Sequence, residues 1–124
     1  MGILIDSDIL IEVSRGRNED VIATWNEVGV SDQVLFCSPV TIAELWHGAQ
    51  PREYNALDAL FGALMCVTID HKIGKRAGDY LREYGKSHHV ELGDALIAAT
   101  AYIHGAALWT RNRKHYPMKD ISFF

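Results

Sequence analysis

The sequence predicts an α/β fold in which a central parallel sheet of four to five strands is covered by helices on both faces. Short apolar segments alternate along the chain with stretches of helical periodicity, which is the pattern of βαβ units. The apolar segments are nearly continuous, as expected of parallel strands that are buried on both faces. The length of 124 residues, with 48% hydrophobic and 23% charged residues, fits a single domain over residues 1–124.

Strands are predicted where a short aliphatic run is bounded by a turn residue or an acid. The expected strands are 2–5, 34–37, 66–69, 107–110 and a short one at 121–124. Apolar spacing and capping residues predict the helices between them. The expected helices are 8–14, capped by Ser7 or Asp8, then 19–28, 41–49, a stretch that opens at Pro51, 71–86, and a last one from 91 or 92 to 104. The last helix is apolar nearly all round, so we expect it to be buried on most sides.

The composition argues against several classes of protein. No apolar run approaches the roughly 20 residues that span a bilayer. The first apolar run lacks a basic start and ends at Asp6, so we expect no signal peptide and a cytoplasmic location. Cys37 and Cys66 form no CxxC pair and are expected to be buried free thiols. Neither GxxxxGK nor GxSxG occurs, which argues against a phosphate-binding loop and an esterase.

Charge is divided unevenly along the chain, whose net charge is −4. Residues 1–70 hold three basic residues and eleven acids, whereas residues 71–124 hold nine basic residues and five acids. The second half is therefore a candidate surface for a phosphate backbone, while the acids of the first half hold a cation. Ordinary solvated helix faces are the alternative interpretation, and charge alone favours it.

Acids follow the predicted strands at the edge where ligands collect in parallel sheets. Asp6 directly follows the first strand, with Ser7 and Asp8 behind it. A helix needs only one capping residue, and three candidates stand in a row here. Capping and ligand binding are therefore equally open for Asp6. Glu44 lies on the helix after the second strand, where residues 41–44 fit a capping box, and the pattern alone favours capping.

Asp94 stands at the start of the apolar helix that precedes the fourth strand. An enclosed carboxylate there needs a partner or a cation. Glu91 lies three residues earlier, on the same face if the helix already includes it. Two enclosed acids repel each other unless a cation neutralises them, so we interpret Asp94 as a metal ligand.

Such a set of acids is typical of metal-assisted hydrolysis of phosphodiesters. Oxygen ligands select Mg²⁺ or Mn²⁺, and the metal activates a water and stabilises the leaving oxygen. Thr110 or Asn112, which follow the fourth strand, would orient the water or the phosphate. Arg111 and Arg113 would hold the nucleic-acid backbone. Asp8 and Glu91 are further candidates for positioning water or substrate.

Four segments resemble the motifs of the PIN domain, in the family's order and over nearly the whole chain. They are residues 4–11, residues 38–45 with Gly48, residues 94–101 and residues 108–116. The resemblance is strongest to the VapC-type toxins of prokaryotic toxin–antitoxin operons. It implies a three-layer α/β/α domain and an endoribonuclease that depends on Mg²⁺ or Mn²⁺. A homodimer and an inhibitory antitoxin protein are implied as well.

The resemblance also assigns roles to individual residues. It implies that Asp6, Glu44 and Asp94 are the metal-binding, catalytic carboxylates, which reverses the preference for capping at Glu44. Asn112 stands at the fourth catalytic position, where the family often has Asp, and it brings no charge. The expected substrate is a tRNA, rRNA or mRNA, without involvement of a membrane.

Other functions remain open at the level of sequence. One is a PIN-like module that has lost catalysis and binds RNA or protein, which Asn112 motivates. Another is a nuclease of the same chemistry that processes RNA or cuts DNA. Trp25, Trp46 and the apolar stripe of residues 57–64 could form a groove for an antitoxin helix. Filling of the core or of a dimer contact is the favoured interpretation for most of them.

Overall fold

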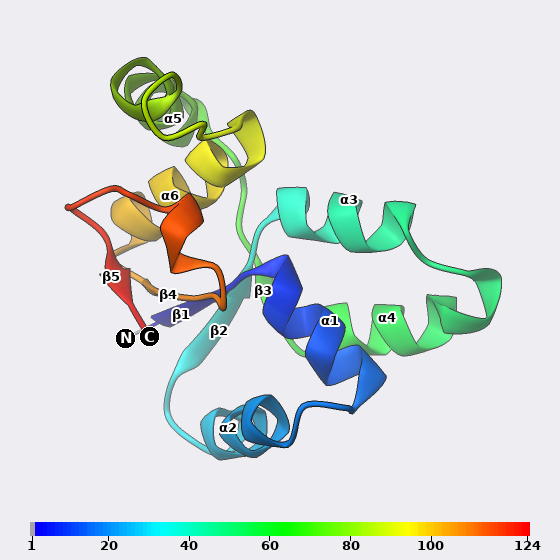
Figure 1. Ribbon diagram of the computed structural model, residues 1–124. Helices are drawn as coiled ribbons and strands as arrows, with labels where there is room; N and C mark the ends of the chain where they lie inside the picture. The colour runs from blue at the N-terminus through cyan, green and yellow to red at the C-terminus, as the bar shows by residue number, and fades with distance from the viewer. Residues whose placement is uncertain (1) are drawn as a thin grey trace.

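Five parallel strands form the central sheet of the computed structural model, which describes residues 2–124 (Figure 1). The strands are β1 (Gly2–Ile5), β2 (Val34–Cys37), β3 (Met65–Cys66), β4 (Ala107–Trp109) and β5 (Ser122–Phe123). Their order across the sheet is β3-β2-β1-β4-β5, and all four pairings are parallel. Strand β1 is therefore central, and the residue that follows it has neighbours on both sides.

Helices connect the strands and cover both faces of the sheet (Figure 1). They are α1 (Ser7–Arg15), α2 (Glu19–Gly29), α3 (Pro39–His47), α4 (Tyr54–Gly62), α5 (His71–Tyr84) and α6 (Leu92–His104), with short 3₁₀ turns at Pro51–Glu53 and Arg113–His115. None of the helices described within residues 2–124 is long and apolar enough to cross a membrane.

The alternation of side chains along β1 divides the core into two layers. Leu4 is fully buried against α5 and α6. Ile3 and Ile5 point to the opposite face and pack with residues of α1, α2, α3 and α4. Full burial of an aliphatic side chain stabilises the fold by roughly 1.5–3 kcal/mol, so both faces of β1 anchor the sheet. The prediction of a parallel sheet with helices on both faces is confirmed.

The third strand is shorter than predicted. Only Met65 and Cys66 pair with β2, instead of residues 66–69. Because β3 lies at the edge of the sheet, it is held from one side, and beyond Cys66 only the Val67 N–H still donates to the Cys37 carbonyl. The edge position also exposes Cys66, so the prediction of two buried thiols is correct for Cys37 and wrong for Cys66.

The starts of two helices differ from the predictions. Helix α1 begins at Ser7 with Asp6 as its cap, instead of Ser7 or Asp8. Helix α3 begins at Pro39, and the Ser38 hydroxyl accepts the N–H of Val40 at 3.1 Å. The predicted capping box at residues 41–44 is therefore wrong, because these residues lie inside the helix. Proline at the first helical position loses no hydrogen bond and fixes the backbone for the helix.

Candidate active site

Asp6 lies at the end of the central strand, where β1, β2 and β4 run side by side. Its N–H donates to the Trp109 carbonyl at 3.0 Å and extends the sheet by one bond. Its Oδ1 accepts the N–H of Ser7 at 2.8 Å and so caps α1. The residue is only 8% exposed. The sheet and the helix together therefore fix the direction of this carboxylate.

Two hydroxyl groups donate to the other oxygen of Asp6. Thr110, which follows β4, donates from Oγ1 to Oδ2 at 3.0 Å. Tyr116 donates from its phenol to the same oxygen at 2.7 Å. Burial raises the pKa of Tyr116, and the negative charge of Asp6 raises it further, so the phenol remains a neutral donor. A carboxylate has about four acceptor positions, and three of those on Asp6 are occupied by Ser7, Thr110 and Tyr116.

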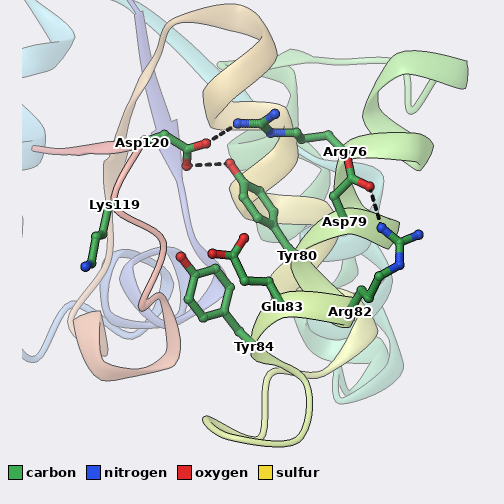
Figure 2. A pocket seen from close by; sticks show the side chains of 8 residues that line it. All are labelled: Arg76, Asp79, Tyr80, Arg82, Glu83, Tyr84, Lys119 and Asp120. Atoms are coloured by element: carbon green, nitrogen blue, oxygen red, sulfur yellow. Dashed lines mark hydrogen bonds and ion pairs between the residues drawn. The ribbon is translucent and has the colours of Figure 1, made fainter.

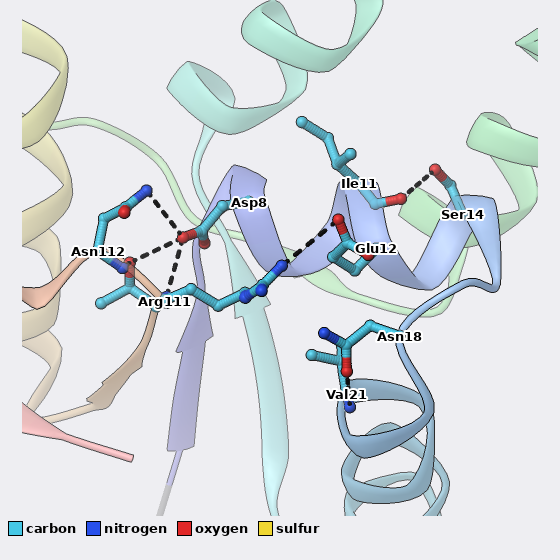
Figure 3. A network of polar contacts seen from close by, with 9 residues as sticks. Asp8, Ile11, Glu12, Ser14, Asn18, Val21, Arg111 and Asn112 are labelled. Carbon is cyan, nitrogen blue, oxygen red and sulfur yellow. Dashed lines mark hydrogen bonds and ion pairs between the residues drawn. The ribbon is translucent and has the colours of Figure 1, made fainter.

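Asp8 connects α1 to the turn after β4 (Figure 3). Its Oδ2 accepts the N–H of Arg111 at 2.9 Å, the amide of Asn112 at 3.3 Å and the Thr110 hydroxyl at 3.4 Å. The Arg111 guanidinium lies 3.4 Å from Glu12 on the same helix. Asp8, Arg111 and Asn112 line an open hollow of about 200 Å³. Asn112 thus helps to hold the Asp8 carboxylate in place, because its side-chain amide donates a hydrogen bond to Oδ2.

Glu44 and Asp94 face the same cluster of negative charge. Partial desolvation raises the pKa of Glu44, and the charges of Asp6, Asp94 and Asp8 raise it further. Desolvation also raises the pKa of Asp94, against the opposing effect of His115, and the charge of Asp6 adds to the rise. Burial raises the pKa of Asp8, and the negative charge of Asp6 raises it further. The fold therefore gathers four carboxylates whose charges repel one another.

The chemistry of this cluster fits a hard divalent cation. Mg²⁺ retains several waters and binds through one or two carboxylates, so it does not need a closed cage of protein ligands. Within residues 2–124, no three His, Cys, Asp or Glu side chains converge closely enough to hold an ion directly. Among the same residues, Asp8 Oδ1 is a buried oxygen with no hydrogen-bond partner. A water-carrying cation would satisfy that oxygen and relieve the repulsion.

Not every residue that the sequence predicts for this site lies with the cluster. Like Glu44, Glu91 has an exposed side chain, and it occupies the cap position of α6. The prediction that Glu91 is enclosed is therefore wrong, although its charge still raises the pKa of Asp94. The reason is that α6 begins at Leu92, which is itself 61% exposed. Arg113 donates to the Phe124 carbonyl at 3.2 Å and lies over the Phe123 ring, so its charge points to the C-terminus.

Sequence reasoning missed two residues that the structure brings to the cluster. Tyr116 is 4% exposed and donates to Asp6. His115 lies near enough to Asp94 to lower its pKa. His115 ends the 3₁₀ turn Arg113–His115, and Tyr116 follows it directly. Their distance from the carboxylates therefore depends on how that turn folds back toward the sheet. Tyr116 stands between a run of polar and charged residues, 111–115, and Pro117, so its burial had no local signal in the sequence.

Three comparisons relate this geometry to known proteins. The sequence profile of the PIN domain matches residues 3–121. Ribonuclease VapC10 of Mycobacterium tuberculosis is 39% identical over 119 residues, which cover 94% of this chain and 86% of that protein. VapBC2 from Rickettsia felis, solved with a promoter DNA fragment, has a TM-score of 0.83 at 20% identity, covering 100% of this chain and 98% of that chain. A toxin–antitoxin complex from Klebsiella pneumoniae has a TM-score of 0.74 at 25% identity, covering 94% and 92%.

The fold and the matched profile define the class of protein: the chain belongs to the PIN-domain family. Its similarity to VapC10 extends over nearly the whole chain, so the resemblance to VapC-type proteins noted in the sequence is confirmed. The three-layer α/β/α architecture expected from that resemblance is confirmed as well.

Proposed function

We propose that the chain is a metal-dependent endoribonuclease and the toxin of a toxin–antitoxin pair. The observation that carries the proposal is the convergence of Asp6, Glu44 and Asp94, whose charges act on one another at the carboxyl edge of the sheet. The similarity to VapC10, named a ribonuclease, supports RNA as the substrate. Mg²⁺ or Mn²⁺ would supply an activated water and stabilise charge on the leaving oxygen.

Each carboxylate has a distinct part in this proposal. Asp6, Glu44 and Asp94 would hold the cation partly through its bound waters, with Asp6 using the acceptor position left free by its three donors. Thr110 and Tyr116 keep Asp6 in one rotamer, because both donate to the same oxygen. Preorganised ligands avoid the cost of reorienting charge during the reaction. Asn112 orients Asp8 and is near enough to the hollow to hydrogen-bond a phosphate or a water.

Partners of the chain follow from the same comparison. We propose that a cognate antitoxin protein inhibits the chain, because the Klebsiella pneumoniae relative in fold is a toxin–antitoxin complex. We also propose a homodimer and a cytoplasmic location. Trp46 is 39% exposed and stacks on Tyr54 with ring centroids 4.5 Å apart, so this pair is available to a partner. Leu57, by contrast, is buried and belongs to the protein's own core.

The direct test is cleavage of a pool of tRNA and ribosomal RNA by purified protein with Mg²⁺, with Mn²⁺ or with EDTA. Discrete fragments that need metal are expected from the wild type. Asp94→Asn should abolish them, whereas Asp58→Asn, which changes an exposed acid on α4, should leave them unchanged. An Asp94→Asn protein that cuts as fast as the wild type would refute the assignment of the site.

A second candidate function is a PIN-like module that binds RNA or protein without cutting it. The observation that favours it is Asn112, which donates to Asp8 and adds no fourth charge to the site. In this case folded protein would cleave no RNA with either metal, and calorimetry would detect no Mn²⁺ binding that depends on Asp94. A nuclease that cuts DNA would be recognised by parallel assays on single-stranded and duplex DNA.

A further inference from the structure

The arginines of the chain divide into two groups by what their side chains contact. All four arginines in residues 71–124 are engaged by the protein itself. Arg76 pairs with Asp120, Arg82 donates to Asp79 at 2.9 Å, Arg111 lies 3.4 Å from Glu12, and Arg113 donates to the Phe124 carbonyl. Figure 2 shows the first two of these pairs, with the Tyr80 phenol also directed at Asp120. The guanidinium groups of residues 71–124 therefore all contact other groups of the protein itself.

The other group consists of Arg15, Arg17 and Arg52, which are the only basic residues in the first seventy. All three are exposed, and within residues 2–124 none of them has an ion pair or a side-chain hydrogen bond. They come from the end of α1, the following turn and the 3₁₀ turn Pro51–Glu53. The fold nevertheless brings them to one open hollow of about 650 Å³.

The lining of this hollow indicates the chemistry of its ligand. Besides the three arginines it contains Ser14, Gly48, Gln50 and Glu53, and no large apolar side chain. The Glu53 carboxylate already accepts the N–H of Gln50 at 2.9 Å. Three guanidinium groups and one carboxylate share the hollow, which leaves two positive charges for an anion to neutralise. A planar guanidinium is the side chain best suited to bind phosphate with two parallel hydrogen bonds.

The hollow also adjoins the carboxylate cluster. A second cavity, of about 100 Å³, shares Ser14, Arg15, Gly48 and Glu53 with it. The rest of its lining consists of Glu44 and apolar residues of α1, α3 and α4 and of the turn after α3. The two cavities therefore form one depression that leads from the three arginines to a proposed metal ligand. A strand bound along it would have phosphates over the arginines and a further phosphate toward the acids.

We propose that Arg15, Arg17 and Arg52 form a binding subsite for the phosphate backbone of single-stranded RNA, next to the cleavage site. The proposal rests on the proposed nuclease function for its choice of polyanion. The proposed phosphate-binding surface lies within residues 1–70, which are acidic overall. The charge distribution along the sequence had instead indicated residues 71–124. An acidic segment of a protein partner is the competing ligand. RNA is favoured because the proposed nuclease must hold a nucleic-acid backbone beside its catalytic carboxylates, and the depression joins the three arginines to Glu44.

The test compares RNA binding by the wild type and by the triple variant Arg15→Gln, Arg17→Gln, Arg52→Gln. The matched control is Lys72→Gln, Lys75→Gln, Lys86→Gln, which removes the same charge from exposed positions of α5 and the turn after it. Fluorescence anisotropy of a short labelled single-stranded RNA is measured in EDTA over a series of salt concentrations. Circular dichroism checks that all three proteins are folded.

Each neutralised phosphate contributes about 0.7 to the slope of log affinity against log salt for a single strand. The arginine variant should therefore lose about two from this slope and on the order of 100-fold in affinity near 0.1 M salt. The lysine control should change by less than about threefold. An unchanged slope in the arginine variant, or an equal loss in the control, would overturn the proposal.

Two further measurements separate this proposal from its alternatives. Competition with polyglutamate tests the acidic protein, because loss of polyglutamate binding with unchanged RNA binding would overturn the RNA subsite. Cleavage by the same wild-type preparation with Mn²⁺ tests the proposed function separately. Loss of RNA affinity in the arginine variant supports the subsite even if the wild type cuts nothing. Normal cleavage with unaltered RNA affinity in that variant refutes the subsite and leaves the nuclease standing.

Discussion

Replacing Tyr116 by phenylalanine removes one hydroxyl from the centre of the carboxylate cluster and changes little else. The phenol donates to Asp6 at 2.7 Å, and the two residues are 4% and 8% exposed. The ring of phenylalanine fills the same space, so the variant leaves no cavity of the size that makes truncations costly. We therefore expect Tyr116→Phe to report the hydrogen bond to Asp6 and the position of that carboxylate.

The expected loss of stability follows from the charge and burial of the acceptor. A hydrogen bond to a charged group contributes about 1.5–3 kcal/mol. Asp6 keeps two other donors, Ser7 and Thr110, which places the expected loss near the middle of that range, at about 2 kcal/mol. With an unfolding entropy of about 2.1 cal/mol/K per residue, this corresponds to a fall in Tm of roughly 8 °C. Weaker positioning of a ligand should also lower Mn²⁺ affinity about 10–100-fold.

The chain offers a closely matched control. Tyr80 is 3% exposed and donates from its phenol to Asp120 at 2.8 Å, remote from the carboxylate cluster. Urea unfolding in EDTA and calorimetric Mn²⁺ titration are measured for Tyr116→Phe and Tyr80→Phe. Both variants should lose stability, but only Tyr116→Phe should lose Mn²⁺ affinity. A Tyr116→Phe protein within about 0.5 kcal/mol of the wild type, or equal Mn²⁺ affinities in both variants, would refute the reasoning.

Three other expectations follow from the structure. Because Asp8, Glu44 and Asp94 have raised pKa values, the folded state retains protons that the unfolded state has already released. In EDTA, the free energy of unfolding should therefore fall as the pH rises from about 4 through the raised pKa values; urea titrations that show a rise would contradict this. Asp94→Asn should stabilise the metal-free protein, because it removes repulsion, yet abolish the rise in Tm that Mn²⁺ gives the wild type; differential scanning calorimetry measures both. Gly105→Ala should cost about 1–2 kcal/mol in urea unfolding, since Gly105 ends α6 with φ of 59°.

The sheet was predictable because apolar strands that alternate with helices leave little choice of architecture. Residues 2–5 and 34–37 are strands at the predicted positions, since each is an apolar run with a sharp polar boundary. The edge strand β3 was predicted to begin one residue too late and to end three residues too late. Its sequence at 66–69 has strand propensity, but pairing from one side holds only its first residues. Propensity alone does not reveal which strand will lie at an edge.

The candidate site was predictable in its acids and in Thr110 and Asn112, but not in the Tyr116 phenol that orients Asp6. Asp6 and Asp94 stand out in the sequence because each follows or precedes an apolar element at the ligand-binding edge. The donors Tyr116 and Asn112 come from a turn whose conformation depends on tertiary packing, and no periodicity marks it. The same limit applies to the arginines. Linear charge counts gave weight to residues 71–124, whereas pairing within the fold leaves Arg15, Arg17 and Arg52 free for a ligand.

Capping and ligand binding are compatible at Asp6, which resolves the choice that the sequence left open. Capping uses one acceptor position of Oδ1, and the hydroxyls of Thr110 and Tyr116 use Oδ2. One acceptor position remains, and the central strand and three donors hold it in a single direction. A carboxylate held so firmly beside three others raises the energy of the metal-free protein, because neither Asp6 nor Asp8 can rotate away from the repulsion without losing its hydrogen bonds. Binding of a divalent cation would remove that penalty, so the proposed affinity for metal and the repulsion in the metal-free fold would have the same physical origin.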